Sequence, residues 1–111
     1  MELIARGDVV IAAQKGAMTG KPRPVLVIQT NVANHDHDSI TACLISTELR
    51  GAGLVRLAIS PNSDNGLTEP SEIQVDLIYT FRRENIDQRA GRLAADDMQR
   101  VDEALRRWLD L

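Results

Sequence analysis

Short runs of apolar residues, separated by polar turns, occupy most of the chain. Val25 to Ile28 is apolar at every position, which indicates a strand covered on both faces. Ile73 to Leu77 alternates apolar and polar residues, which indicates a strand with one face in solvent. The segments expected to form strands are Val9 to Ala13, Val25 to Ile28, Ile40 to Ser46, Leu54 to Ile59, Ile73 to Leu77 and a short segment near Arg89 to Leu93.

The pattern changes to a helical period near the C-terminus. Apolar residues recur at helical spacing at Met98, Val101, Leu105, Trp108 and Leu109. A helix is therefore predicted from Asp96 to Leu109, with its apolar face packed on the sheet. Between the strands, Asn31 to Asp38 is expected to hold a turn or a short helix, and Asp64-Asn65-Gly66 a turn. The prediction is one α+β domain over 1–111: a small, strongly bent antiparallel barrel of five to six strands with a C-terminal helix.

The amino-acid composition narrows the classes of function that the chain can have. Aromatic residues make up only 3% and the net charge is −3, which disfavours a general nucleic-acid coat protein and a platform of stacked bases. Binding to RNA must then depend on arginine, hydroxyl and backbone groups. The single cysteine, Cys43, excludes an intrachain disulfide and is expected to be a buried thiol. Neither a signal peptide nor a membrane helix is recognisable, so the cytoplasm is the expected location.

The segment Lys21-Pro22-Arg23-Pro24 is the first candidate for chemistry. Two prolines stiffen the backbone around Arg23, whose guanidinium can bind a phosphate through two parallel hydrogen bonds. The strand that follows would make Arg23 project from the rim of the sheet. A solvated basic turn is the commoner explanation of such a segment when it is taken alone.

Hydroxyls at the end of the third predicted strand are the second candidate. Ser46 and Thr47 could donate hydrogen bonds to a phosphate oxygen, although strand-end hydroxyls more often bond the backbone. The cations expected to line an RNA groove nearby are Lys15, Lys21, Arg50 and Arg56. The run His35-Asp36-His37-Asp38 lacks further ligands at a convincing spacing, so a polar loop is expected there and no metal site.

Several blocks, in order, resemble the MazF/PemK family of toxins. They are Arg6-Gly7-Asp8-Val9-Val10, Gly20 to Gln29 with its Arg-Pro-Val-Leu-Val-Ile-Gln core, Leu44-Ile45-Ser46-Thr47, Asn65-Gly66-Leu67, Pro70-Ser71, Val75-Asp76 and Gly91-Arg92-Leu93. The resemblance runs almost from end to end. It implies the plasmid-maintenance-toxin barrel, a homodimer, and a cognate MazE-like antitoxin that blocks the RNA groove.

The resemblance also implies an activity: metal-independent, sequence-specific cutting of single-stranded RNA through attack by the ribose 2′-hydroxyl, with no cofactor. The family's catalytic arginine and its Ser/Thr fall on Arg23 and Ser46. Many relatives carry a Gly-Ser-Glu-Gln stretch in a longer first loop, where this chain has residues 15–20 without a carboxylate. The preferred RNA sequence therefore cannot be carried over.

Two questions stay open at the level of sequence. Arginine rarely deprotonates, so the general base is unassigned, with His35 and His37 as weak candidates. The same barrel also serves toxins of the CcdB type, which inhibit DNA gyrase without being enzymes. The pair Arg23 and Ser46 distinguishes the alternatives, because only a nuclease needs it.

Overall fold

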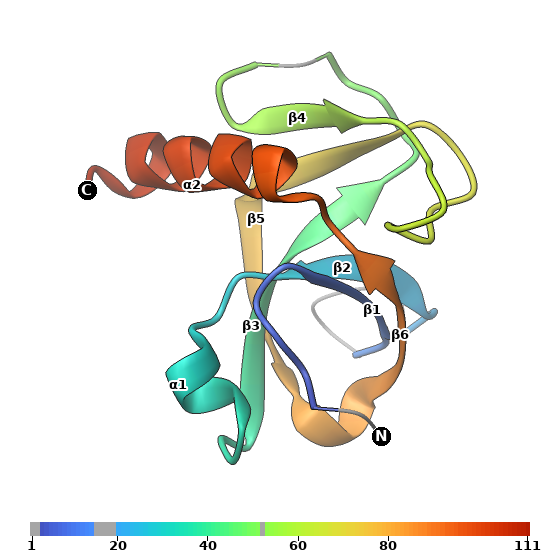
Figure 1. The fold of residues 1–111 in the computed structure, drawn as a ribbon, viewed down its shortest axis with the longest axis vertical. Helices are drawn as coiled ribbons and strands as arrows, with labels where there is room; N and C mark the ends of the chain where they lie inside the picture. Colours follow the sequence, from blue (N-terminus) through green and yellow to red (C-terminus); the bar gives the residue numbers. More distant parts are fainter. Residues whose placement is uncertain (1–2, 15–19, 52) are drawn as a thin grey trace.

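A computed structural model describes residues 3–14, 20–51 and 53–111, which form one antiparallel sheet and a C-terminal helix (Figure 1). The strands are β1 (Asp8–Ala12), β2 (Arg23–Val27), β3 (Ser39–Ser46), β4 (Arg56–Ile59), β5 (Ser71–Arg82) and β6 (Ile86–Arg92). Their order across the sheet is β4-β5-β3-β2-β1-β6. The helices are α1 (Asn31–Asn34), the 3-10 turn η1 (Arg83–Asn85) and α2 (Ala95–Leu109).

The bent sheet has two cores, one on each face. On the α2 face, the buried residues are Val9, Leu26, Cys43, Ile45, Ile59, Ile73, Val75, Leu93, Val101, Ala104 and Leu105. On the opposite face, the strands wrap around Ile4, Val10, Ala12, Val25, Val27, Ile40, Ala42, Phe81 and Ile86. Each fully buried aliphatic or aromatic side chain contributes about 1.5–3 kcal/mol. Two cores explain why Val25, Leu26 and Val27 are all buried, as the uninterrupted apolar run predicted.

The sheet is not closed by strand pairing, because β4 and β6 are both edge strands. The segment after β4 covers the gap instead. The Arg92 N–H donates to the Asp64 carbonyl at 2.7 Å, and Gly91 lies so close to Asp64 and Asn65 that a Cβ there would overlap their backbone. Gly66, with φ of +70°, makes the turn that the sequence predicted. The α+β class, the six strands and the C-terminal helix are confirmed; the barrel is a strongly bent open sheet.

The bounds of β5 and β6 differ most from the prediction, since β6 spans Ile86–Arg92 where Arg89 to Leu93 was expected. β5 runs over Ser71–Arg82, well beyond Ile73 to Leu77, and its ladder with β3 shifts register between Cys43 and Leu44. Gln74 was expected in solvent but is buried, because the second core and the chain around it cover that face too.

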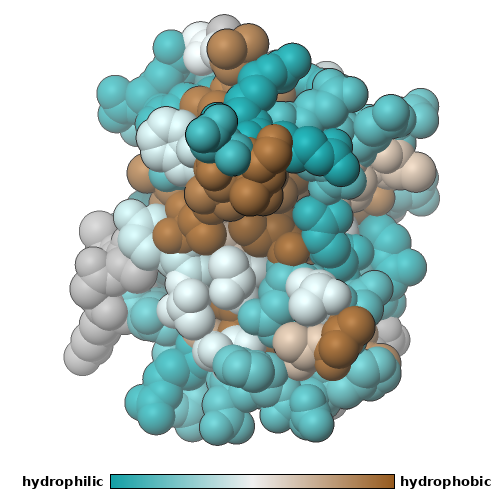
Figure 2. Space-filling model, turned by 90° about the vertical axis from the view of Figure 1, so that its left-hand side faces the viewer, coloured by the Kyte–Doolittle hydropathy of each residue, from teal (hydrophilic) through white to brown (hydrophobic). Residues whose placement is uncertain are grey.

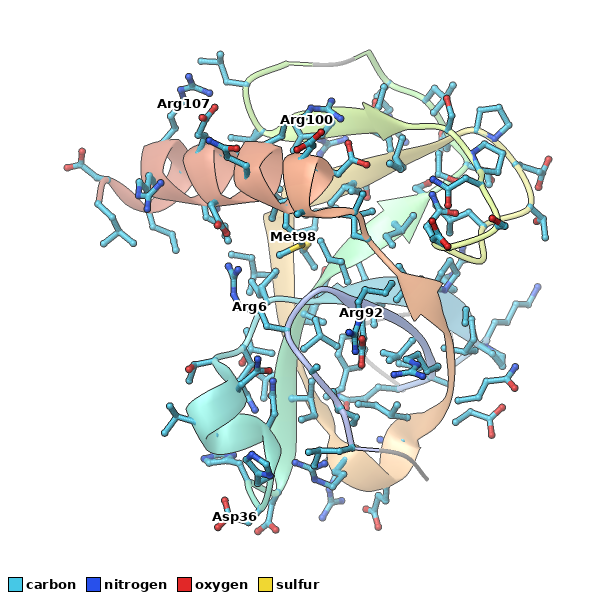
Figure 3. All side chains as sticks on the ribbon, viewed as in Figure 1. Arg6, Asp36, Arg92, Met98, Arg100 and Arg107 are labelled. Carbon is cyan, nitrogen blue, oxygen red and sulfur yellow. The ribbon has the colours of Figure 1, made fainter. Side chains whose placement is uncertain are left out.

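The helix α2 begins and ends within one residue of the prediction, yet only part of its apolar face packs on the sheet. Met98 points from α2 toward the sheet, whereas Arg107 points away from it (Figure 3). Trp108 and Leu109 are 51% and 50% exposed, because the last turn of α2 extends past the sheet (Figure 1). Within the described ranges, no helix has both the length and the apolar character of a membrane span.

Cys43 lies in the middle of β3 and is fully buried, as predicted. Burial raises the pKa of the Cys43 thiol to about 12. The thiol therefore belongs to the core on the α2 face and has no role as a nucleophile.

Candidate active site

Arg23 and Ser46 lie at the same end of the sheet. Arg23 is the first residue of β2 and Ser46 is the last of β3. The last pair of the antiparallel β2–β3 ladder is Val25 with Leu44, and Arg23 and Ser46 each lie two residues beyond it. Since side chains alternate along a strand, both project to the face that carries Val25 and Leu44. The sheet thus brings the two predicted catalytic residues to one end and one face.

Arg23 is exposed and forms no ion pair with any carboxylate in the described part of the chain. Other arginines are held: Arg6 by Asp102 at 2.8 Å, Arg92 by Asp8 at 3.0 Å and Arg100 by Asp97 at 3.0 Å. Figure 3 shows Arg6 between α1 and α2 and Arg92 beside β1 and β6. Lys21, two residues before Arg23, is also exposed and without a described carboxylate partner. The start of β2 therefore presents two cations to solvent.

Ser46 is half-buried, and its hydroxyl oxygen accepts a hydrogen bond from the Glu48 N–H at 3.0 Å. This is the strand-end bonding that hydroxyls commonly make. A serine hydroxyl has one donor and two acceptor positions, so its proton and one lone pair stay available. Thr47 is exposed beside it.

The β3–β5 ladder places Glu72 directly opposite Ser46. Glu72 is only 2% exposed, and its Oε1 has no hydrogen-bond partner in the described structure. Sequence reasoning missed this residue. Its only signal was a carboxylate within a strand of alternating polarity, where solvent exposure is the ordinary expectation.

The other predicted RNA contacts divide into three groups. Lys21 and Thr47 are exposed near the site. Arg56 forms two hydrogen bonds to Asp76, at 3.2 and 2.8 Å, and these bonds raise the pKa of Arg56. Arg50 is paired with Glu48 at 2.9 Å, both side chains being exposed. Lys15 lies outside the described residues.

A hollow of about 520 Å³ opens at the C-terminal end of β1, near the start of β2. Its lining includes Gln14, Gly20, Arg82 and Asn85. The Gln14 side chain holds this wall together, since it donates to the Thr80 carbonyl and accepts from the Arg82 N–H. The sequence did not indicate Arg82 as a site residue. Arg82, at the end of β5, is far from Gly20 along the chain, and the two come to the same hollow only in the folded structure.

The loop from His35 to Asp38 is exposed, and the His37 ring lies 3.1 Å from the Ser39 hydroxyl. Among the described residues, no group of three or more His, Cys, Asp or Glu side chains is arranged to hold a metal ion. The loop leads into the start of β3, at the opposite end of that strand from Ser46. Neither histidine is therefore placed at the end of the sheet that carries Arg23.

The chain is similar to known proteins over nearly its whole length. The family model described as PemK-like, MazF-like toxin of type II toxin–antitoxin system matches residues 5–109. A probable endoribonuclease MazF from Mycolicibacterium smegmatis is 42% identical over 100 residues, covering 90% of this chain and 91% of that protein. The solved Mycobacterium tuberculosis toxin MazF-mt6 superposes with a TM-score of 0.80 at 26% identity, over 94% and 97% of the two chains. An endoribonuclease in complex with its cognate antitoxin, from a mycobacterial species, has the same fold, with a TM-score of 0.82 at 23% identity and coverage of 97% and 96%.

Proposed function

Since this chain belongs to the family of PemK-like, MazF-like toxins of type II toxin–antitoxin systems, we infer that it is an endoribonuclease. Its substrate is single-stranded RNA, mRNA above all, whose cutting stops translation and growth in the cytoplasm. The alternative of a CcdB-type gyrase inhibitor is not favoured, because the relatives carry the name endoribonuclease. The single observation that supports the site is that Arg23, which has no carboxylate partner among the described residues, lies at the same end and face of the sheet as Ser46.

The reaction is attack by a ribose 2′-hydroxyl on the adjacent phosphorus, which leaves a cyclic phosphate and a 5′-hydroxyl. It needs in-line geometry, stabilisation of the charge that develops on phosphorus-bound oxygens, and proton transfers. Arg23 supplies the second requirement, because its fixed fork of N–H groups matches two such oxygens. An arginine already paired with a carboxylate would first have to exchange that partner, and Arg23 has none in the described structure.

Ser46 and the nearby cations supply the remaining contacts. Ser46 lies where its hydroxyl can contact the RNA beside that phosphate, while Lys21 and Thr47 are exposed for the neighbouring backbone. The hollow beside Gln14 and Arg82 has room for a nucleotide. Arg56 and Arg50 contribute to RNA binding only if the RNA displaces Asp76 and Glu48.

A homodimer is part of the proposal. Figure 2 shows an apolar patch on the face where α2 overhangs the sheet, and a hollow of about 400 Å³ there is lined by Ile28, Leu105, Leu109 and Leu111 among others. Leu109 and Leu111 are 50% and 84% exposed and belong to this patch. In the proposed homodimer, this apolar patch is buried against a second copy of the chain. Leu109→Glu should therefore halve the mass measured by light scattering, and an unchanged mass would place the dimer elsewhere.

An antitoxin encoded beside this chain is the second partner. It would block access to Arg23, so its presence should abolish RNA cutting. The neighbouring reading frame is then expected to encode a small acidic protein with a DNA-binding start.

The test of the activity is cleavage of a mixed single-stranded RNA in EDTA, with the products sequenced. The wild-type protein should cut at a short preferred sequence, and Arg23→Ala should not. Intact RNA together with stalled gyrase would instead favour the CcdB-type alternative.

A further inference from the structure

We propose that Glu72 is the terminal proton acceptor of the reaction and that it acts through Ser46. The proposal rests on the endoribonuclease function above and assigns the base that the sequence left open. Glu72 is a positioning and relay residue in this scheme: it contacts Ser46, and Ser46 contacts the RNA.

The first observation is the pairing register between β3 and β5. Ser46 and Glu72 are a direct pair in the antiparallel β3–β5 ladder, so their side chains leave the same face of the sheet. Cβ atoms of such a pair are about 4.5–5.5 Å apart, within reach of a hydrogen bond from a hydroxyl to a longer carboxylate side chain.

The second observation is an unmet hydrogen bond on each partner. The Oε1 atom of Glu72 is buried and accepts nothing in the described structure. The Ser46 hydroxyl accepts from the Glu48 N–H, but no acceptor for its own proton is found among the described residues. Buried carboxylate oxygens are normally hydrogen-bonded, and an exception calls for an explanation. The Ser46 hydroxyl, a donor on the residue opposite Glu72, provides that explanation.

None of the other charged groups around Glu72 bonds its Oε1 in the described structure. Arg56 on β4 is one such cation, since Glu72 contributes to raising the pKa of Arg56. The Arg56 guanidinium is, however, already bonded through two nitrogens to Asp76. Arg23 projects to the same face from β2 but is exposed, while Glu48 follows β3 and is paired with Arg50. Arg56 therefore does not bond the Oε1 atom of Glu72, which stays without a hydrogen-bond partner in the described structure.

The proton steps balance. As the 2′-oxygen bonds to phosphorus, its proton moves to the available lone pair of Ser46 Oγ, and the Ser46 proton moves to Glu72. The bond from phosphorus to the 5′-oxygen breaks, and the leaving oxygen takes a proton from water. Glu72 then returns its proton to the hydroxide so formed. The Glu48 N–H donates to Ser46 Oγ and so holds that oxygen in place during both proton transfers.

The test is Glu72→Gln, which keeps shape and burial but removes the proton acceptor. Single-turnover cutting of an RNA substrate should slow by about a hundredfold, the usual size of a general-base effect, with the Kd for RNA unchanged within about threefold. Glu103→Gln on the exposed face of α2 removes the same charge and is the matched control, expected at the wild-type rate. If the wild type does not cut RNA, the proposed function fails; if Glu72→Gln cuts like wild type, only the relay fails.

A double mutant separates the relay from a structural role. In the background of Ser46→Ala, adding Glu72→Gln should change the rate by less than about threefold, because the two residues act as one unit. Multiplicative losses, or a fall in RNA affinity that matches the fall in rate, would overturn the relay. Glu72→Val is the second variant: it should fold and melt at or above the wild-type temperature, since it removes a buried unsatisfied carboxylate. A large drop in melting temperature for both variants would mean that Glu72 is structural.

Discussion

Ser46 at the end of β3 lies directly opposite Glu72 on β5, and Glu72 is buried with one oxygen unbonded. A carboxylate in that position reduces stability, since ionised groups prefer water. Such a cost is typical of functional sites. The pair also lies at the end of the sheet from which the exposed Arg23 projects.

Arg23→Ala should lower the single-turnover rate of RNA cutting by about 10²–10³-fold, because it removes the donor that meets charge in the transition state. Arg23→Lys should recover little of this loss, since an ammonium lacks the two-pronged geometry. Rapid-quench kinetics at saturating protein measure both. A lysine variant at full rate would mean that Arg23 acts only as a point charge.

Ser46→Ala should slow cutting by about a hundredfold, as Glu72→Gln does, whereas Ser46→Thr should retain most activity because it keeps the hydroxyl. The same quench assay reports both variants, and circular dichroism checks that they fold. Equal losses in the alanine and threonine variants would point to packing at the end of β3 and away from the hydroxyl.

Cys43 should resist thiol reagents in the folded protein. With a pKa of about 12, only about one thiol in ten thousand is ionised at pH 8, against roughly a tenth for an exposed cysteine of pKa 9.0. Because the folded pKa is raised, stability is complete below the usual pKa of 9.0 and falls as the pH rises toward about 12. The rate at which a chromogenic disulfide reagent reacts with Cys43 should be measured in buffer and again in urea. Slow reaction in buffer and fast reaction in urea are expected, and fast reaction in buffer would contradict the burial of Cys43.

Gly91→Ala should destabilise the protein, because a Cβ at Gly91 would overlap the backbone of Asp64 and Asn65, where the segment between β4 and β5 packs on β6. We expect a loss of about 1–3 kcal/mol, as for other overpacked sites. Gly53→Ala is the matched control, since a Cβ there meets nothing within 4 Å. Urea unfolding compares the two, and equal midpoints would show that the segment yields at little cost.

Much of this architecture follows from local patterns. The uninterrupted run at Val25 to Val27 predicted a strand with two covered faces, and helical spacing from Met98 onward predicted α2. The length of β5 did not follow, because its register shift opposite Cys43 and Leu44 breaks the alternation that marks a strand. Long-range pairing also decides which polar residues are buried, so Gln74 and Glu72 looked like surface positions.

The candidate site shows the same division. Arg23 and Ser46 could be selected from the stiff Pro-flanked segment, the strand end and the family resemblance. Arg56 was selected as an RNA contact because its charge is visible in the sequence, whereas its partner Asp76 comes from another strand. Glu72 became a candidate only once β3 and β5 were paired.

The central claim is that the RNA itself supplies the nucleophile while Arg23 binds the phosphate it attacks. The most direct measurement uses an RNA with a single 2′-deoxy nucleotide on the 5′ side of the cut position. We predict that this substrate binds with an unchanged Kd and stays intact in EDTA, while the all-ribose strand is cut to a cyclic phosphate. Cutting of the deoxy-substituted strand at the same position would contradict the account.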